Sequence, residues 1–220
     1  MKGLEPGKRP ALLISECQNL ITNDAYSDSP LIRQVVERQI ISKINELAAQ
    51  FRVRDLPVVH CIIAARPGFE GFRINCVLAA QLKKVGRLVA GTPDAAIHDG
   101  ITVGVKDIVA QRYHGMAPFS GTDLDAILRG LDVDTVVLAG VSTNIALPGA
   151  ATEAIARGYD VILVEDCTAG GTAETHQMQV VMHLPLLSTI TDGASISRWV
   201  EAGTEVNGLR STAPTEVPAG

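Results

Sequence analysis

The chain has 220 residues, a formal net charge of −5 and apolar residues at 46% of its positions, which predicts one α/β domain with a sizeable core. No basic stripe is present, so nucleic acid is not an expected partner, and no apolar run approaches the roughly 20 residues of a membrane span. The first ten residues lack the apolar stretch of a signal peptide, and none of the four cysteines forms a CxxC pair. We therefore expect a reduced, cytoplasmic protein.

The first half of the chain alternates apolar runs with helical spacing. Residues 11–15 and 57–63 are apolar runs that indicate buried strands. Residues 20–31 are polar and loop-like, and apolar positions recur at helical spacing over 32–52, which predicts a single amphipathic helix. Residues 64–100 form a long irregular excursion with a short helix near Cys76 to Lys84; such an excursion is often a lid or an oligomer contact.

The second half repeats the alternation. A third, less apolar strand is expected at 107–112, and a helix begins at Gly121-Thr122-Asp123-Leu124. Later expected elements, in chain order, are a strand at 135–138, a helix ending near Ala156, a strand at 159–164, a helix at 172–187 that Pro185 should end, a strand at 188–191 and a short helix to Val200. Residues 1–202 then form one domain, and 203–220 are expected to be a frayed tail.

The stretch from Asp134 to Gly158 organises the predicted site. Its β-branched run is typical of a strand buried on both faces, and Ala139, Gly140 and Val141 end that strand. Suitable helix N-caps follow at Ser142, Thr143 and Asn144. A buried strand that leads directly into a helix start places free backbone N–H groups at the carboxyl edge of the sheet, where they bind an anion or an oxyanion.

Several segments resemble a known family. Ala11-Leu12-Leu13-Ile14-Ser15-Glu16-Cys17-Gln18-Asn19 is similar to the opening strand of the isochorismatase-like (cysteine hydrolase) superfamily, and further segments match in order: Phe119-Ser120-Gly121-Thr122-Asp123-Leu124, Thr135 to Asn144, Gly158-Tyr159-Asp160-Val161 and Glu165-Asp166-Cys167. The resemblance covers about residues 10–200. It implies a three-layer α/β/α sandwich with a six-stranded parallel sheet, and a homo-oligomer, either a dimer or a tetramer.

The family's amide hydrolases use an Asp, a Lys and a Cys, and the resemblance places Glu16, Arg112 and Ala146 at those positions. A methyl group cannot attack a carbonyl, so a covalent thioester route is excluded at Ala146. Glu16 can act as a general acid or base, or it can be a structural partner of Arg112. Arg112 does not transfer protons near neutral pH but can bind a carboxylate or an oxyanion; alternatively, it is a structural arginine.

Other candidate site residues lie in the loop after the third strand and around the central turn. His114 is a candidate acid or base in a shaped loop, although a lone loop histidine is more often not catalytic. The turn Gly140-Val141-Ser142 resembles the family segment that carries a non-proline cis peptide bond. Substrate binding is expected at Gln18, Tyr113, Phe119, Val141, Ser142, Asn144, Ile145 and Ala146.

These residues support two main hypotheses. In the first, the chain hydrolyses a small carboxylate- or amide-containing metabolite without a cysteine nucleophile. In the second, it is a catalytically inactive member that binds a small molecule or acts as a scaffold. A third reading uses a displaced thiol, Cys17 or Cys76, although Cys17 should point into the core. No cofactor is expected, and no spaced histidine pair after His60 indicates a metal site.

Overall fold

The computed structural model describes the backbone of residues 1–210 and the side chains of residues 1–202. Its six parallel strands form one sheet in the order β3-β2-β1-β4-β5-β6. The strands are β1 (Pro10–Ser15), β2 (Val58–Ile63), β3 (Ile108–Arg112), β4 (Thr135–Val141), β5 (Asp160–Ala169) and β6 (Thr189–Thr191). The predicted α/β fold with a six-stranded parallel sheet is confirmed.

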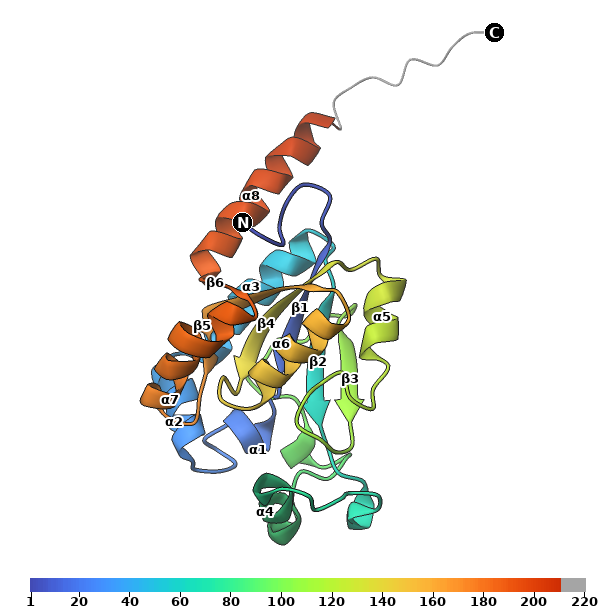
Figure 1. The fold of residues 1–220 in the computed structure, drawn as a ribbon, viewed down its shortest axis with the longest axis vertical. Helices are drawn as coiled ribbons and strands as arrows, with labels where there is room; N and C mark the ends of the chain where they lie inside the picture. The colour runs from blue at the N-terminus through green and yellow to red at the C-terminus, as the bar shows by residue number, and fades with distance from the viewer. Residues whose placement is uncertain (211–220) are drawn as a thin grey trace, which may run out of the picture.

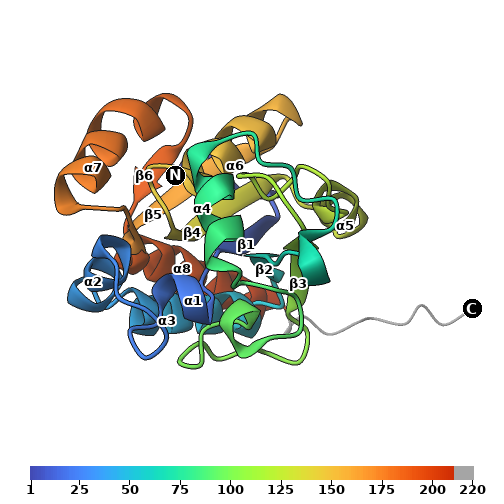
Figure 2. The same ribbon diagram turned by 90° about the horizontal axis from the view of Figure 1, so that it is seen from below.

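Helices cover both faces of the sheet, with α3 and α8 on one side and α5 and α6 on the other (Figures 1 and 2). The helices are α1 (Asn19–Thr22), α2 (Pro30–Glu37), α3 (Ile40–Val53), α4 (Val77–Val85), α5 (Leu124–Gly130), α6 (Ala146–Ala156), α7 (Ala173–Met178) and α8 (Gly193–Arg210). Among the described helices, none is long and apolar enough to cross a membrane.

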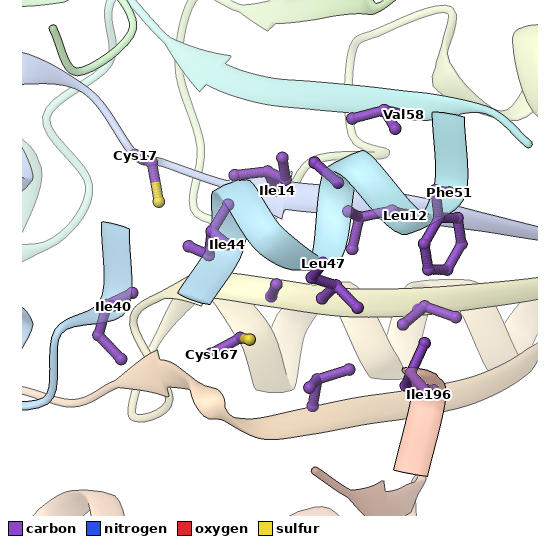
Figure 3. Close-up of a cluster of buried hydrophobic side chains, with 14 of the residues drawn as sticks. Leu12, Ile14, Cys17, Ile40, Ile44, Leu47, Phe51, Val58, Cys167 and Ile196 are labelled. Carbon is purple, nitrogen blue, oxygen red and sulfur yellow. The ribbon is translucent and has the colours of Figure 1, made fainter. Parts of the chain in front are cut away.

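The core consists of two layers because successive residues of a strand point to opposite faces. Along β1, Leu12 and Ile14 face α3, and Ala11 and Leu13 face α5 and α6. Figure 3 shows the first layer, in which the apolar stripe of α3 lies against the sheet. On the other face, α6 packs through small side chains that let its backbone approach the strands closely: Ala146, Ala150, Ala151 and Ala154.

The predicted helix over 32–52 is wrong in one respect, because the structure divides it into α2 and α3. Gln39 between them adopts a left-handed conformation with φ of 55°, which interrupts the helical path. The loop expected at 20–31 also contains helical residues. It includes the end of α1 and the start of α2, where Ser29 Oγ accepts the N–H of Ile32 at 3.2 Å and Pro30 occupies the first helical position.

Later elements also differ from their predicted bounds. β4 ends at Val141, within the residues expected to end it, whereas β5 extends to Ala169 rather than ending at Val164. The helix expected at 172–187 is broken into α7, a π-helical turn at Gln179–His183 and a 3₁₀ turn at Leu184–Leu186. Pro185 lies in this last turn, which agrees with its expected role as the end of the helix.

The last helix is longer than expected. α8 continues past Val200 to Arg210, so its backbone enters the range predicted to fray, and residues 211–220 lie outside the described part of the chain. Trp199 anchors the helix to the N-terminal segment, because its indole Nε1 donates to the carbonyl of Leu4 at 3.1 Å and the guanidinium of Arg54 stacks on its ring at 4.2 Å.

The topology identifies one edge of the sheet as the candidate binding site. β2 and β3 continue to one side of β1, and β4, β5 and β6 lie on the other side. The strand order therefore reverses direction between β1 and β4, and open α/β sheets bind ligands beside the carboxyl ends of the strands at such a switch point. Glu16 and Ser142 follow these two strands directly, so the fold brings both to this edge.

Candidate functional site

A cleft of about 300 Å³ lies at the carboxyl edge of the sheet. Its floor contains residues that follow β1 and β4, and α4, which lies beyond the arrowheads of the strands in Figure 1, contributes to its far wall. The lining residues are Glu16, Ile21, Leu31, Ile63, Phe72, Leu78, Ala79, Leu82, Leu88, Gly115, Met116, Ser142, Asn144, Ile145 and Gly171. The excursion at 64–100, expected to be a lid or an oligomer contact, therefore supplies part of the wall of this cleft.

Glu16 is the charged residue of this cleft. It follows β1 and adopts a left-handed backbone conformation with φ of 51°, which is uncommon for a residue other than glycine. Its N–H donates to the carbonyl of Cys61 at 2.9 Å, which ties it to the end of β2. The side chain is 17% exposed, so the carboxylate remains accessible from the cleft.

Arg112 is the partner of this carboxylate. It ends β3, is 1% exposed and is among the largest fully buried side chains of the described residues. Nη2 donates to Glu16 Oε1, and Nε donates to the carbonyl of Gly115 at 3.3 Å. Nη1 is buried and has no partner among the described residues. The two predicted residues therefore form one ion pair, with Glu16 toward the cleft and Arg112 behind it.

The turn after β4 forms the other side of the floor. Its Val141–Ser142 peptide bond is cis, as the resemblance implies. The expected side-chain cap at Ser142, Thr143 or Asn144 is wrong: α6 begins at Ala146 with Ile145 as the N-cap, which makes no side-chain cap bond. The side chain of Asn144 instead accepts the N–H of Gly171 at 2.9 Å. The N–H of Ala146 belongs to the first turn of α6 and has no intrahelical acceptor.

Behind this turn lies a polar network that the sequence did not indicate. Thr143 Oγ1 is 3.2 Å from His176 Nδ1, and His176 Nε2 is 2.8 Å from Glu165 Oε1. Arg38 Nη2 donates to the same carboxylate at 2.6 Å. The hydrogen bond from His176 and the charge of Arg38 lower the pKa of Glu165 to about 2, against the opposing effect of burial. The network therefore attaches the turn to β5, α7 and α2.

The structure brings only some of the predicted substrate-binding residues to the cleft. Ser142, Asn144 and Ile145 line it together with Glu16. The others do not line it: Val141 and Ala146 are fully buried, and the buried side chain of Gln18 is occupied by backbone bonds, with Nε2 at 2.8 Å from the carbonyl of Ile63.

The loop after β3 also departs from expectation. Phe119 is buried in the core under α5 and α6, with its ring 6.1 Å from that of Tyr159. Tyr113 is 36% exposed and stacks under the guanidinium of Arg66 at 4.0 Å. His114 is exposed and does not line the cleft. Their positions near the end of β3 did not show that these residues lie away from the site whereas Arg112 reaches Glu16. Packing against distant segments decides where each side chain lies.

The sequence also missed the apolar wall of the cleft. Phe72, Leu78, Leu82 and Leu88 come from the excursion at 64–100, and Met116 comes from the loop after β3. One signal was available, because Leu78 and Leu82 are four residues apart and therefore lie on one face of the expected helix.

No thiol occupies the cleft. Burial raises the pKa of Cys17 to about 12, and this side chain points into the core beside α3 (Figure 3). Cys76 is exposed and serves as the N-cap of α4, where its Sγ accepts the N–H of Ala79 at 3.5 Å. Within the described residues, no group of three or more His, Cys, Asp or Glu side chains is arranged to hold a metal ion.

A second hollow of about 370 Å³ lies at the opposite edge of the sheet, near the start of β2 and β3. Four of its charged side chains form ion pairs, because Arg52 binds Asp107 at 2.6 Å and Lys106 binds Asp55 at 2.8 Å. The fifth, Arg9, donates to the carbonyls of Leu131 and Asp55. The cleft at the carboxyl edge is the better candidate, because it lies at the switch point of the sheet and contains an accessible carboxylate.

Comparisons with known proteins agree with this geometry. The isochorismatase domain matches residues 10–195. A maleamate amidohydrolase of Pseudomonas putida is 28% identical over 78% of this chain and 77% of its own length, and a probable inactive nicotinamidase of Arabidopsis thaliana is 31% identical over 80% and 89%. A cysteine hydrolase from Pseudomonas syringae pv. phaseolicola has a similar structure, with a TM-score of 0.77 at 19% identity over 92% of this chain and 95% of its own. The chain therefore belongs to the isochorismatase family.

Proposed function

We propose that this chain hydrolyses a small carboxylate- or amide-containing metabolite in the carboxyl-edge cleft, without a covalent cysteine intermediate. The observation that carries the proposal is the accessible carboxylate of Glu16, held by the buried guanidinium of Arg112 at the switch point of the sheet. Amidohydrolases among the relatives of the chain support the reaction class.

In this mechanism, Glu16 moves the proton. Water attacks the carbonyl carbon of an amide as one of its protons passes to the carboxylate, and a C–O bond forms. The C–N bond then breaks as Glu16 returns the proton to the departing nitrogen. Arg112 stays charged throughout and holds the carboxylate in place. The N–H of Ala146, at the start of α6, is the donor for the developing oxyanion, because the N–H of Leu147 already donates to Ser142 and residue 148 is a proline.

The absence of a nucleophile at Ala146 supports a route without a thioester intermediate. A methyl group occupies the first position of α6, and it is fully buried. The buried Cys61 near Arg112 does not replace it, because burial raises the pKa of that thiol to about 12, and a thiol that stays protonated is a poor nucleophile.

The experiment measures ammonia release from nicotinamide and a panel of simple amides, and, separately, pyruvate release from isochorismate, which contains no nitrogen. Glu16→Gln keeps the size of the side chain but cannot accept the proton, so we expect turnover to fall at least about 100-fold. Glu201→Gln, on the exposed face of α8, is the matched control. Turnover that is unchanged in Glu16→Gln, or an acyl-enzyme adduct in intact-protein mass spectra, would contradict the mechanism.

The second candidate function is binding without catalysis. The relative named as a probable inactive nicotinamidase favours it, as does the methyl group at Ala146. In that case, pure protein turns over none of the panel, and calorimetry detects a ligand whose affinity falls in Glu16→Ala.

A further inference from the structure

The walls of the cleft differ in character from its floor. Large apolar side chains make up most of the lining, and they converge from many parts of the chain: Ile21, Leu31, Ile63, Phe72, Leu78, Leu82, Leu88, Met116 and Ile145. Polar side chains line only the floor, where Glu16, Ser142 and Asn144 follow β1 and β4. A ligand that fits this distribution has one polar end, which meets the floor, and an apolar body, which meets the walls.

On this basis, and resting on the proposed hydrolysis, we propose that the substrate is a neutral primary amide with an apolar body, rather than a metabolite that carries a free carboxylate. The amide group lies at Glu16 and the first turn of α6. The apolar body extends toward Phe72, Leu78 and Leu82, in the direction of α4, which Figure 2 shows in front of the sheet.

The charges of the site support a neutral substrate. No lysine, arginine or histidine lines the cleft among the described residues, and its one charged lining residue is the anionic Glu16. Arg112 does not compensate, because it is 1% exposed and does not line the cleft, and its Nη2 and Nε already bind Glu16 and the carbonyl of Gly115. A substrate carboxylate would lose its water against apolar walls with no cation to replace it, which is strongly unfavourable.

The apolar wall is a built part of the fold. The segment around Leu88 pairs with Ala65, which lies just beyond the end of β2. The carbonyl of Leu88 accepts the N–H of Ala65 at 2.8 Å, and the N–H of Ala90 donates to the carbonyl of Ala65 at 2.8 Å. Phe72 packs edge-to-face on Phe69, with ring centroids 5.4 Å apart. Leu88 and Phe72 therefore have fixed partners of their own.

The test uses two amides that differ in one group. Hexanamide has an apolar end, and adipamic acid has a carboxylate at that end. We expect hexanamide to have at least about a tenfold higher kcat/KM for ammonia release and a correspondingly lower Kd by calorimetry. Equal or better use of adipamic acid overturns the proposal while leaving hydrolysis intact. Hexanamide that binds selectively without turnover supports the ligand class and refutes the proposed hydrolysis. Absence of binding by both amides also overturns it.

A charge placed on the wall provides the second arm. Leu78 lines the cleft and is 45% exposed, so Leu78→Lys should fold, and it supplies the missing cation. We expect it to shift the ratio of the two affinities at least about tenfold toward adipamic acid. Val77→Lys, on the neighbouring residue that is 72% exposed and does not line the cleft, should leave the ratio within about twofold. A ratio that is unchanged in Leu78→Lys overturns the proposal.

Discussion

At the scale of single residues, Glu16 and Arg112 depend on each other. Removing the guanidinium in Arg112→Met leaves a carboxylate that is 17% exposed without its cation, so we expect a loss of about 2–4 kcal/mol in the free energy of unfolding. Adding Glu16→Gln to Arg112→Met removes the unpaired charge and should recover part of that loss. Urea unfolding of the two single variants and the double variant measures this coupling; additive losses would show that the pair is not coupled.

The lowered pKa of Glu165 predicts how the free energy of unfolding depends on pH. Its pKa is about 2 in the folded protein against an ordinary value of 4.5, first because His176 donates to it and then because Arg38 lies beside it. A lowered folded pKa contributes stability that is fully present above the unfolded value and is lost as the pH falls from about 4.5 toward about 2. We expect Glu165→Gln to reduce the change in the free energy of unfolding between about pH 4.5 and about pH 2, measured from urea midpoints at each pH. The control Glu201→Gln should show the same pH dependence as the parent protein.

At the scale of elements, β1 and β4 approach so closely that only glycine fits at position 140. A Cβ there would overlap the carbonyl oxygen of Ser15, and φ is +95°. We expect Gly140→Ala to cost about 3–5 kcal/mol in the free energy of unfolding. Gly158, after α6, has φ of +87° but no atom within 4 Å of a built Cβ, so Gly158→Ala should cost only about 1–2 kcal/mol. Thermal unfolding compares the two, and equal losses would refute steric overlap as the cause.

Elements also show how far local patterns reach. The apolar stripe over 32–52 was read correctly as helical, but its spacing does not reveal that Gln39 turns left-handed and divides the segment into α2 and α3. β5 is similar, because Glu165, Asp166 and Thr168 interrupt the apolar run although pairing with β4 continues to Ala169. Periodicity reports burial along one element, whereas breaks and extensions depend on the neighbours against which the element packs.

At the scale of the whole molecule, the homo-oligomer remains a prediction. Exposed apolar side chains gather between α7 and β6, where Val181 is 60%, Met182 62% and Leu186 82% exposed. Such a group marks a contact surface more often than isolated exposed residues do. We expect light scattering after size exclusion to give the molar mass of a dimer or a tetramer. The double variant Met182→Lys with Leu186→Lys should have a lower molar mass. Val105→Lys, at an apolar residue that is fully exposed and lies outside this group, is the control. A monomeric parent protein would refute the prediction.

The sequence by itself determined the parallel sheet and the edge at which the site lies. Apolar runs separated by helical spacing specify strands joined by crossovers, and the carboxyl ends of parallel strands share one edge, so Glu16 and the turn after residue 140 had to lie close together. The pairing of Arg112 with Glu16, across 96 positions of the chain, was one of the alternatives that the resemblance raised. Only the tertiary structure decided which other side chains join them, because Phe119 turns into the core and residues 64–100 supply an apolar wall. These placements depend on contacts between distant segments, which local spacing does not encode.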